Sequence, residues 1–288
     1  MKRAMDNAEQ IADWNGALGR RWAELQRDLD AMIMPFGRAA LDAAAPSPGQ
    51  RVLDIGCGCG ETSIQLARQV GKTGAVVGVD VSRPMLAVAR ARLASGPLAQ
   101  LAQLSFREAD ASAAKLPAGN DLLFSCFGVM FFQHPAVAFG QMRKWLRPGG
   151  RCVFVCWRKP RDNAWAMTPL MAARQAMKIT PAAADPLAPG PFAFADEERL
   201  TGILVDAGFG DIAVQRFDAA VVLGATPRVA AENAAGFGPV SRLLREVGAA
   251  HLPILLDAME QALGPLAAAD GRVSLPGSTW IASATNPG

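Results

Sequence analysis

Three glycines and one acid in the first third of the chain form the pattern with the most chemical content. Gly56, Gly58 and Gly60 alternate along a short loop, where no side chain stops backbone N–H groups from approaching a ligand. An apolar run at residues 52–55 leads into this loop, and a second apolar run ends on Asp80, about 20 residues further on. A carboxylate at that distance can accept hydrogen bonds from both hydroxyls of a ribose. The spacing therefore predicts a nucleoside-binding corner.

Further motifs follow this corner along the chain. Residues 106–111 predict a third strand with Asp110 just past its end, and residues 121–127 predict a fourth strand. Residues 146–155 supply a helix end, a tight turn and a fifth strand. Over roughly residues 50–157 the chain therefore resembles the class I S-adenosylmethionine-dependent methyltransferases, particularly the bacterial group similar to ubiquinone and menaquinone biosynthesis methyltransferases.

The resemblance implies that the cofactor is S-adenosylmethionine and that a defined set of residues binds it. Asp54 and the glycine loop hold the methionine part, and Asp80 accepts hydrogen bonds from the ribose. Asp110 and the backbone of the next residue recognise the adenine edge, while Val81 and Met85 sandwich its ring. The implied cofactor-binding residues are Asp54, Gly56, Cys57, Gly58, Gly60, Asp80, Val81, Met85, Asp110, Ala111 and Phe127. From the residues alone, the alternatives are a helix-capping Asp80, a loop acid at Asp110 and a core Met85.

The apolar segment 127–135 follows the predicted fourth strand, where similar enzymes place residues that flank the methyl group. Methyl transfer from a sulfonium depends mainly on in-line positioning and on the exclusion of water, for which a dry wall is suitable. The candidate residues for binding a small-molecule methyl acceptor are Trp22, Met130, Phe131, Trp157 and Arg158. Trp14 is an alternative to Trp22, and for Arg158 the alternative is a solvated side chain.

His134 is the candidate catalytic residue, because an unperturbed imidazole titrates near neutrality and can act as a general base. A base is needed only where the methyl-accepting atom has a proton to lose. The alternative for His134 is a surface position at the start of a helix that Pro135 opens. His251, the second histidine, is a candidate substrate contact. The chain has no tyrosine, which removes the phenol as an acid or base.

Apolar strands that alternate with helices between residues 49 and 157 predict an α/β fold whose parallel sheet is covered on both faces. With the resemblance, we expect a doubly wound, Rossmann-like sheet of seven strands, mostly parallel with an antiparallel last strand, and helical cap elements. Residues 1–48 are expected to form an N-terminal helical cover and residues 49–157 the cofactor-binding core. Residues 158–288 complete the sheet, with a substrate cap inserted at about 158–195 and 224–270.

Hydrophobic periodicity predicts the elements outside the core. Apolar residues recur every three or four positions over residues 8–34, which predicts one amphipathic helix that ends at Pro35. Two helices between the last two strands are expected to form part of the cap. The remaining predicted elements are helices at 170–177, 196–207, 240–248 and 251–263 and strands at 212–223 and 273–284.

Composition limits the classes of protein. A length of 288 residues, of which 51% are hydrophobic, supports a substantial core. The net charge of +3 is spread without long basic runs, so no nucleic-acid partner is expected. We find no apolar window long enough to span a bilayer and no signal-peptide pattern. Five cysteines without framework spacing predict a reduced, cytoplasmic protein, and the oligomeric state is left open between monomer and homodimer.

Several alternatives remain at the glycine loop. Cys57 and Cys59 could bind a soft metal, but a zinc site needs four donors and no further pair lies nearby, so no metal is expected. A nicotinamide-dependent oxidoreductase shares the loop and the acid but has the spacing Gly-x-Gly-x-x-Gly instead of Gly-x-Gly-x-Gly. A nucleic-acid or protein methyltransferase would need a concentrated basic groove. Binding of the cofactor without catalysis is a further alternative.

Overall fold

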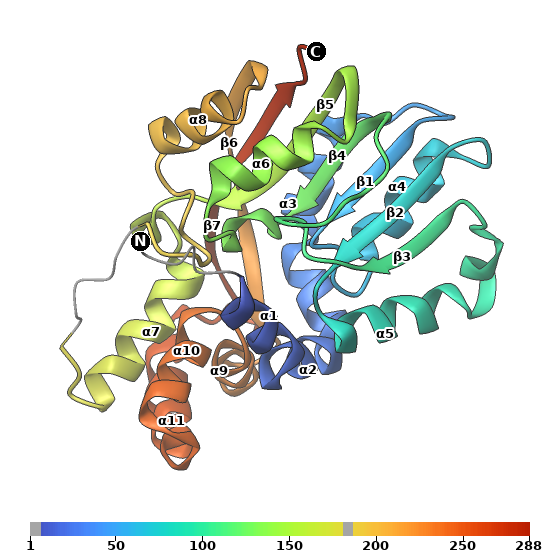
Figure 1. Cartoon of the computed structure of the whole chain (residues 1–288). Helices are drawn as coiled ribbons and strands as arrows, with labels where there is room; N and C mark the ends of the chain where they lie inside the picture. Colours follow the sequence, from blue (N-terminus) through green and yellow to red (C-terminus); the bar gives the residue numbers. More distant parts are fainter. Residues whose placement is uncertain (1–6, 181–186) are drawn as a thin grey trace.

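A seven-stranded sheet forms the centre of the molecule in the computed structural model, which describes residues 7–180 and 187–288 (Figure 1). The pairs formed among β1 to β5 are parallel, whereas β7 is antiparallel to both β5 and β6. The predicted doubly wound fold with an antiparallel last strand is confirmed. In spatial order the strands are β3 (Leu104–Glu108), β2 (Ala75–Asp80), β1 (Arg51–Ile55), β4 (Asn120–Cys126), β5 (Leu146–Trp157), β7 (Val273–Thr285) and β6 (Gly210–Gly224).

The chain order reverses around β1, which lies between β2 and β4. Open α/β sheets bind ligands beyond the carboxyl ends of the strands at such a reversal. Four of the five β1 residues are buried, because helices cover both faces of the sheet. The fold therefore places the loop after β1 at the expected ligand edge.

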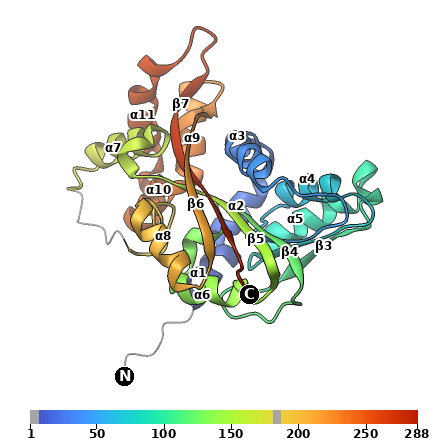
Figure 2. The same cartoon turned by 90° about the horizontal axis from the view of Figure 1, so that it is seen from above.

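Helices from different parts of the chain form the two outer layers (Figure 2). One face is covered by α3 (Gln26–Ala44), α4 (Glu61–Val70) and α5 (Arg83–Leu93), and the other by α6 (Pro135–Arg143) and α8 (Glu197–Asp206). The start of α5 carries a capping residue, Ser82, and an early proline. The Ser82 hydroxyl accepts a hydrogen bond from the Met85 N–H at 3.5 Å, and Pro84 lies in the first turn.

The predicted single helix over residues 8–34 is three helices, α1 (Ala8–Asn15), α2 (Ala17–Glu24) and α3. Gly16 separates the first two with a ψ of −147°, outside the helical range. The prediction that Pro35 ends the helix is wrong, because α3 continues to Ala44. An interior proline costs about 3 kcal/mol, but buried side chains on both sides of it, such as Phe36, each contribute about 1.5–3 kcal/mol.

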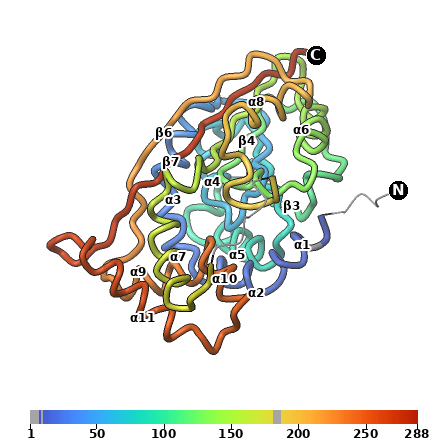
Figure 3. The backbone as a smooth tube through the Cα atoms, turned by 90° about the vertical axis from the view of Figure 1, so that its left-hand side faces the viewer, coloured from blue at the N-terminus to red at the C-terminus, as the bar shows by residue number. Residues whose placement is uncertain are grey.

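Four helices form a cap beyond the carboxyl ends of the parallel strands (Figure 1), and Figure 3 shows these helices from the cap side. They are α7 (Ala164–Ala176), α9 (Pro227–Gly236), α10 (Gly238–Val247) and α11 (Leu252–Leu263), and the last three lie between β6 and β7 in sequence. Helix α9 was not predicted. Its start has a recognisable signal, since the Thr226 hydroxyl accepts a hydrogen bond from Val229 N–H and Pro227 opens the first turn.

Short turns of 3₁₀ helix complete the described structure. They lie at Gly96–Gln100, Val129–Phe131, Pro160–Asp162, Ala249–His251 and Gly264–Leu266. Across residues 7–180 and 187–288, none of the helices has the length and apolar character needed to cross a membrane.

Candidate active site

Asp80 lies at the carboxyl end of β2, where two backbone groups fix its carboxylate. Its Oδ2 accepts a hydrogen bond from the Gly58 N–H and its Oδ1 accepts one from the Ser82 N–H, both at 2.8 Å. Burial raises the pKa of Asp80 above its ordinary value, although these N–H donors oppose the shift. The acid and the glycine loop are therefore held as one unit at the edge of the sheet.

Asp54 is fully buried in β1, and only one of its two carboxylate oxygens has a partner. Its Oδ2 accepts hydrogen bonds from the hydroxyls of Thr62 at 2.8 Å and Ser63 at 2.6 Å, whereas Oδ1 has none. Burial raises the pKa of Asp54 to about 7, against the opposing effect of the two hydroxyls. An unpaired buried acceptor beside the glycine loop fits a ligand that presents a hydrogen-bond donor there.

The glycine loop touches the loop after β4 through backbone atoms. Gly56 has a φ of +68°, and a Cβ at this position would lie 2.6 Å from the Cα of Gly128. A Cβ on Gly128 would lie 2.6 Å from the Ile55 carbonyl oxygen. Both positions therefore require glycine, and they join the predicted cofactor loop to the segment predicted to flank the methyl group.

Asp110 follows β3, so the sheet order places it beside the end of β2. Its Oδ1 accepts hydrogen bonds from the backbone N–H and the hydroxyl of Ser112, both at 2.8 Å, and from Asn7 Nδ2 at 3.3 Å. Ala111 and Met85 are both buried, and Met85 lies against the loop at Gly58. Asp54, Asp80 and Asp110 thus lie in, at the end of and just after three successive strands of the sheet.

The thiols of the loop are buried and uncharged. Burial raises the pKa of Cys57 well above its ordinary value and that of Cys59 to about 12. All five cysteines are free thiols. In the part of the chain that the structure describes, no group of three His, Cys, Asp or Glu side chains is arranged to hold a metal ion.

Arg92 in α5 supports the glycine loop, a role that the sequence did not suggest. Its guanidinium donates a hydrogen bond to the Cys59 carbonyl oxygen at 2.8 Å. The same side chain forms ion pairs with Asp30 at 3.4 Å and with Glu61. Burial raises the pKa of Asp30 to about 6. Arg92 therefore ties the loop to α3, α4 and α5.

The N-terminal helices are fastened to the segment that follows Asp80. The Ser82 hydroxyl donates a hydrogen bond to the Trp14 carbonyl oxygen at 2.7 Å. Asn15 donates through Nδ2 to the Val81 carbonyl oxygen at 2.9 Å and accepts through Oδ1 from the Arg83 N–H at 3.0 Å. Sequence reasoning missed Asn15, because one polar residue on an amphipathic helix looks like any other.

Aromatic side chains gather in two clusters near these elements. In the first, Trp14 makes edge-on contacts with Trp22 and Phe131, at ring-centroid distances of 5.6 and 5.4 Å. In the second, Trp157 stacks on Phe127 at 4.4 Å and also contacts Trp165 and Phe36. Phe127 has a φ of +61°, a strained conformation that is typical of functional sites. Met130, another predicted substrate residue, is almost fully buried.

Trp157 and the neighbouring Arg158 lie on opposite faces of the sheet. A Cβ on Gly277 would meet both Trp157 and Phe36, so these side chains share the face covered by α3. Trp280 in β7 instead donates its indole N–H to the Ala195 carbonyl oxygen at 3.1 Å, on the α8 side.

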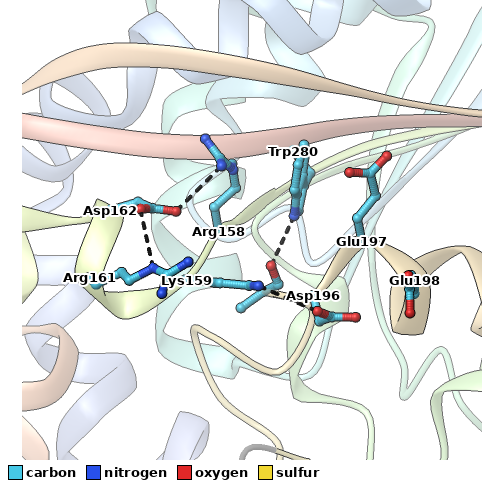
Figure 4. A pocket seen from close by; sticks show the side chains of 9 residues that line it. Arg158, Lys159, Arg161, Asp162, Asp196, Glu197, Glu198 and Trp280 are labelled. Atoms are coloured by element: carbon cyan, nitrogen blue, oxygen red, sulfur yellow. Dashed lines mark hydrogen bonds and ion pairs between the residues drawn. The ribbon is translucent and has the colours of Figure 1, made fainter.

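Arg158 lies on this second face, over the ring of Trp280 at 4.5 Å (Figure 4). It donates a hydrogen bond to the Ser278 hydroxyl at 3.1 Å and forms ion pairs with Asp162 and Asp218 at 3.4 and 3.6 Å. Arg158 lines an open cavity of about 420 Å³ on this side. The structure therefore does not bring Arg158 together with Trp157 and Phe127.

His134 is exposed at the start of α6 and forms no capping hydrogen bond with its side chain. It lies three residues after Phe131 but belongs to neither aromatic cluster. The structure does not bring His134 to the buried acids, and its role as a base stays a prediction.

Comparison with known sequences gives a consistent result. A family model described as a methyltransferase domain matches residues 52–150. The chain is 29% identical over 170 residues to ubiquinone/menaquinone biosynthesis C-methyltransferase UbiE of Geobacter sulfurreducens, which covers 57% of this chain and 64% of the relative. It is 34% identical over 152 residues to nocamycin O-methyltransferase of Saccharothrix syringae, and this match covers 52% of this chain and 53% of that relative. The UbiE of Pseudomonas syringae pv. tomato is 29% identical over 230 residues, which cover 75% of this chain and 87% of that relative. The chain thus spans less than two thirds of the length of the first two relatives.

Solved structures share the fold at low sequence identity. A protein of Bacillus halodurans C-125, described as a candidate methyltransferase, has a TM-score of 0.55 and 16% identity, and the match covers 88% of this chain and 99% of that protein. Phosphoethanolamine N-methyltransferase 2 of Haemonchus contortus, solved with S-adenosyl-L-methionine, has a TM-score of 0.52 and 21% identity, covering 88% of this chain and 53% of that protein. The sequence comparisons, whose matches are methyltransferases, favour this class over a nicotinamide-dependent oxidoreductase.

Proposed function

We propose that this chain is a class I S-adenosylmethionine-dependent methyltransferase similar to the ubiquinone/menaquinone biosynthesis C-methyltransferases, and that it methylates a small apolar or aromatic molecule. S-adenosylmethionine supplies a methyl group on a positively charged sulfur, so the departing thioether is a good leaving group. The protein contributes orientation and the exclusion of water.

We propose that each acid binds a different part of the cofactor. Asp80 accepts hydrogen bonds from the ribose hydroxyls, and its own bonds from Gly58 N–H and Ser82 N–H keep it oriented for this. Asp54 presents its unpaired Oδ1 to the amino group of the methionine part. Asp110 and the backbone of Ala111 bind the adenine edge, next to Val81 and Met85.

The observation that supports a small, apolar acceptor is that both clusters consist of tryptophan and phenylalanine rings. Their rings come from the N-terminal helices, from the segment after β4, from the last residue of β5, and from α7. Gly128 lies in sequence between Phe127 of the second cluster and Phe131 of the first cluster. Its contact with Gly56 joins this segment to the cofactor loop. The rings are Trp14, Trp22, Phe36, Phe127, Phe131, Trp157 and Trp165. Walls of this kind exclude water and favour flat apolar ligands.

The arrangement of charge supports a small molecule over a nucleic acid. The densest basic run, Arg158 to Arg161, is paired with acids. Arg158 pairs with Asp162 and Asp218, and Lys159 pairs with Asp196 at 3.6 Å. Neutralised cations of this kind release few counterions from a phosphate backbone. We also propose a reducing, cytoplasmic setting, which the five free thiols support.

A label-transfer assay tests the proposal. The purified protein is incubated with S-adenosylmethionine labelled in its methyl group and with phenols, quinols and aromatic amines, and separately with total tRNA and a protein extract. We expect label in a small organic-soluble product, and only background with Asp80→Ala. Label confined to tRNA or protein, or no transfer above that background, would contradict the proposed acceptor class. An O-, N- or C-linked product identifies the acceptor atom and tells whether a proton must leave.

A further inference from the structure

The indole nitrogen of Trp22 is shielded from solvent and has no hydrogen-bond partner. Two buried tryptophans do have an acceptor: Trp165 donates to Asn163 Oδ1 and Trp280 donates to the Ala195 carbonyl oxygen, both at 3.1 Å. A buried donor without an acceptor destabilises the folded state, so native structures retain few of them. Trp22 therefore has an unused capacity to donate one hydrogen bond.

The position of Trp22 is between the cofactor loop and the cap. Helix α2 contacts α5, which begins just after Asp80, and it also contacts α9 of the cap. On the α9 side, a Cβ on Gly236 would lie 3.1 Å from Leu25, three residues after Trp22. On the other side Trp14 links Trp22 to Phe131, which follows β4, and the Trp14 carbonyl oxygen accepts the hydrogen bond of the Ser82 hydroxyl.

We propose that Trp22 binds the methyl acceptor by donating its indole N–H to one oxygen of an otherwise apolar, ring-sized molecule. This inference rests on the proposed function and names its substrate class more narrowly. The aromatic rings of Trp14 and Phe131 supply apolar contact, while the indole N–H supplies one directed hydrogen bond. One directed bond in apolar surroundings fixes which edge of a flat molecule faces the transferred methyl group. It also selects against a deoxygenated analogue, which would leave the donor unpaired.

The test compares 1-tetralone with tetralin, because the two probes differ by one carbonyl oxygen. Each is titrated into the full-length protein saturated with S-adenosylhomocysteine, with the indole nitrogens labelled with ¹⁵N. The Trp22 signal is assigned by its absence in Trp22→Phe. We expect 1-tetralone to move this signal downfield, and we expect Trp22→Phe to weaken 1-tetralone binding about tenfold while tetralin binding stays within twofold. Trp14→Phe is the matched control, since it makes a ring of the same cluster smaller and should change the affinity for both probes alike.

A second variant separates the hydrogen bond from the shape of the ring. Incorporation of 3-benzothienylalanine at position 22 keeps a bicyclic aromatic ring and removes only the N–H. We expect the same loss of 1-tetralone affinity with an unchanged melting temperature. The inference is overturned if 1-tetralone fails to move the Trp22 signal up to its solubility limit, or if either Trp22 variant weakens both probes equally. Binding of S-adenosylhomocysteine is measured first and separately, and its absence would contradict the proposed function instead.

Discussion

The proposed cofactor loop, residues 56–60, and the proposed acceptor walls, which are the two aromatic clusters, are built from different kinds of contact. Around the loop, backbone N–H groups and carboxylates at the ends of adjacent strands make the contacts, as between Asp80 and Gly58. The acceptor walls consist of aromatic side chains from segments far apart in sequence, as between Trp14 and Phe131. The loop therefore depends on strand order and on glycine, whereas the walls depend on how the N-terminal helices and the cap pack.

This difference predicts how each region responds to substitution. A change at the loop should abolish binding of the cofactor, which the proposed methyl transfer requires. A change in the walls should alter which acceptor is used and leave cofactor affinity intact. The Gly56–Gly128 contact is the place where the two regions meet through backbone atoms.

The largest expected effect is on cofactor binding in Asp80→Ala. The substitution removes the proposed acceptor for the ribose and also the partner of two backbone N–H groups. Hydrogen bonds to charged groups contribute about 1.5–3 kcal/mol each, so affinity for S-adenosylhomocysteine should fall by roughly 100-fold or more. Calorimetric titration measures it. Glu108→Ala is the control, because Glu108 ends the neighbouring strand β3 but is exposed and pairs only with Arg83. Equal affinities for Asp80→Ala and the wild type would refute the cofactor site.

Trp157→Leu tests the other region. Trp157 is buried and contacts Phe127, Trp165 and Phe36, so its truncation should lower the free energy of unfolding by about 2 kcal/mol. With the acceptor found by label transfer, we expect KM for the acceptor to rise about tenfold while affinity for S-adenosylhomocysteine is unchanged. Trp145→Leu is the control, since Trp145 is equally buried but lies at the amino end of β5. A matching rise in KM in both variants would mean that the effect is general destabilisation.

Much of the loop region could be predicted from the sequence, because parallel strands separated by helices fix where their carboxyl ends lie. Asp54, Asp80 and Asp110 therefore fell on successive strands as expected. The walls could not be predicted in the same way. Trp157 and Arg158 are adjacent in sequence, yet the alternation of side chains at the end of the strand sends them to opposite faces of the sheet.

The errors in the helical regions have a similar cause. The sequence predicted an end of the first helix at Pro35, but burial of residues such as Phe36 maintains α3 through the proline. Helix α9 was missed although Thr226 and Pro227 mark its start. Asn15 and Arg92 were missed because their partners are backbone groups more than 30 positions away in sequence. Local sequence patterns do not predict contacts over such separations.

A smaller expected effect is a pH dependence of stability and of cofactor affinity that arises from Asp54 in the loop region. Because its pKa is raised to about 7, neutral Asp54 stabilises the fold below about pH 4, and this contribution is lost as pH rises through 7. Cofactor binding should change in the opposite direction, since the ionised carboxylate attracts the positively charged amino group of the methionine part. We expect affinity for S-adenosylhomocysteine to increase severalfold from pH 5.5 to 7.5, and to stay constant in Asp54→Asn. An unchanged affinity of the wild type over this range would contradict an electrostatic role for Asp54.

The smallest expected effect concerns the helices that cover the loop. Asn15→Ala removes the hydrogen bonds to the Val81 carbonyl oxygen and from the Arg83 N–H. Loss of about 1 kcal/mol between α1 and this segment should raise the dissociation rate of S-adenosylhomocysteine about fivefold, measured by stopped-flow displacement. Arg83→Ala keeps the backbone N–H and removes only an exposed ion pair with Glu108, so it should leave the rate unchanged. If Asn15→Ala instead weakens only acceptor binding, the hydrogen bonds of Asn15 to the segment after Asp80 serve the acceptor walls and not the cofactor site.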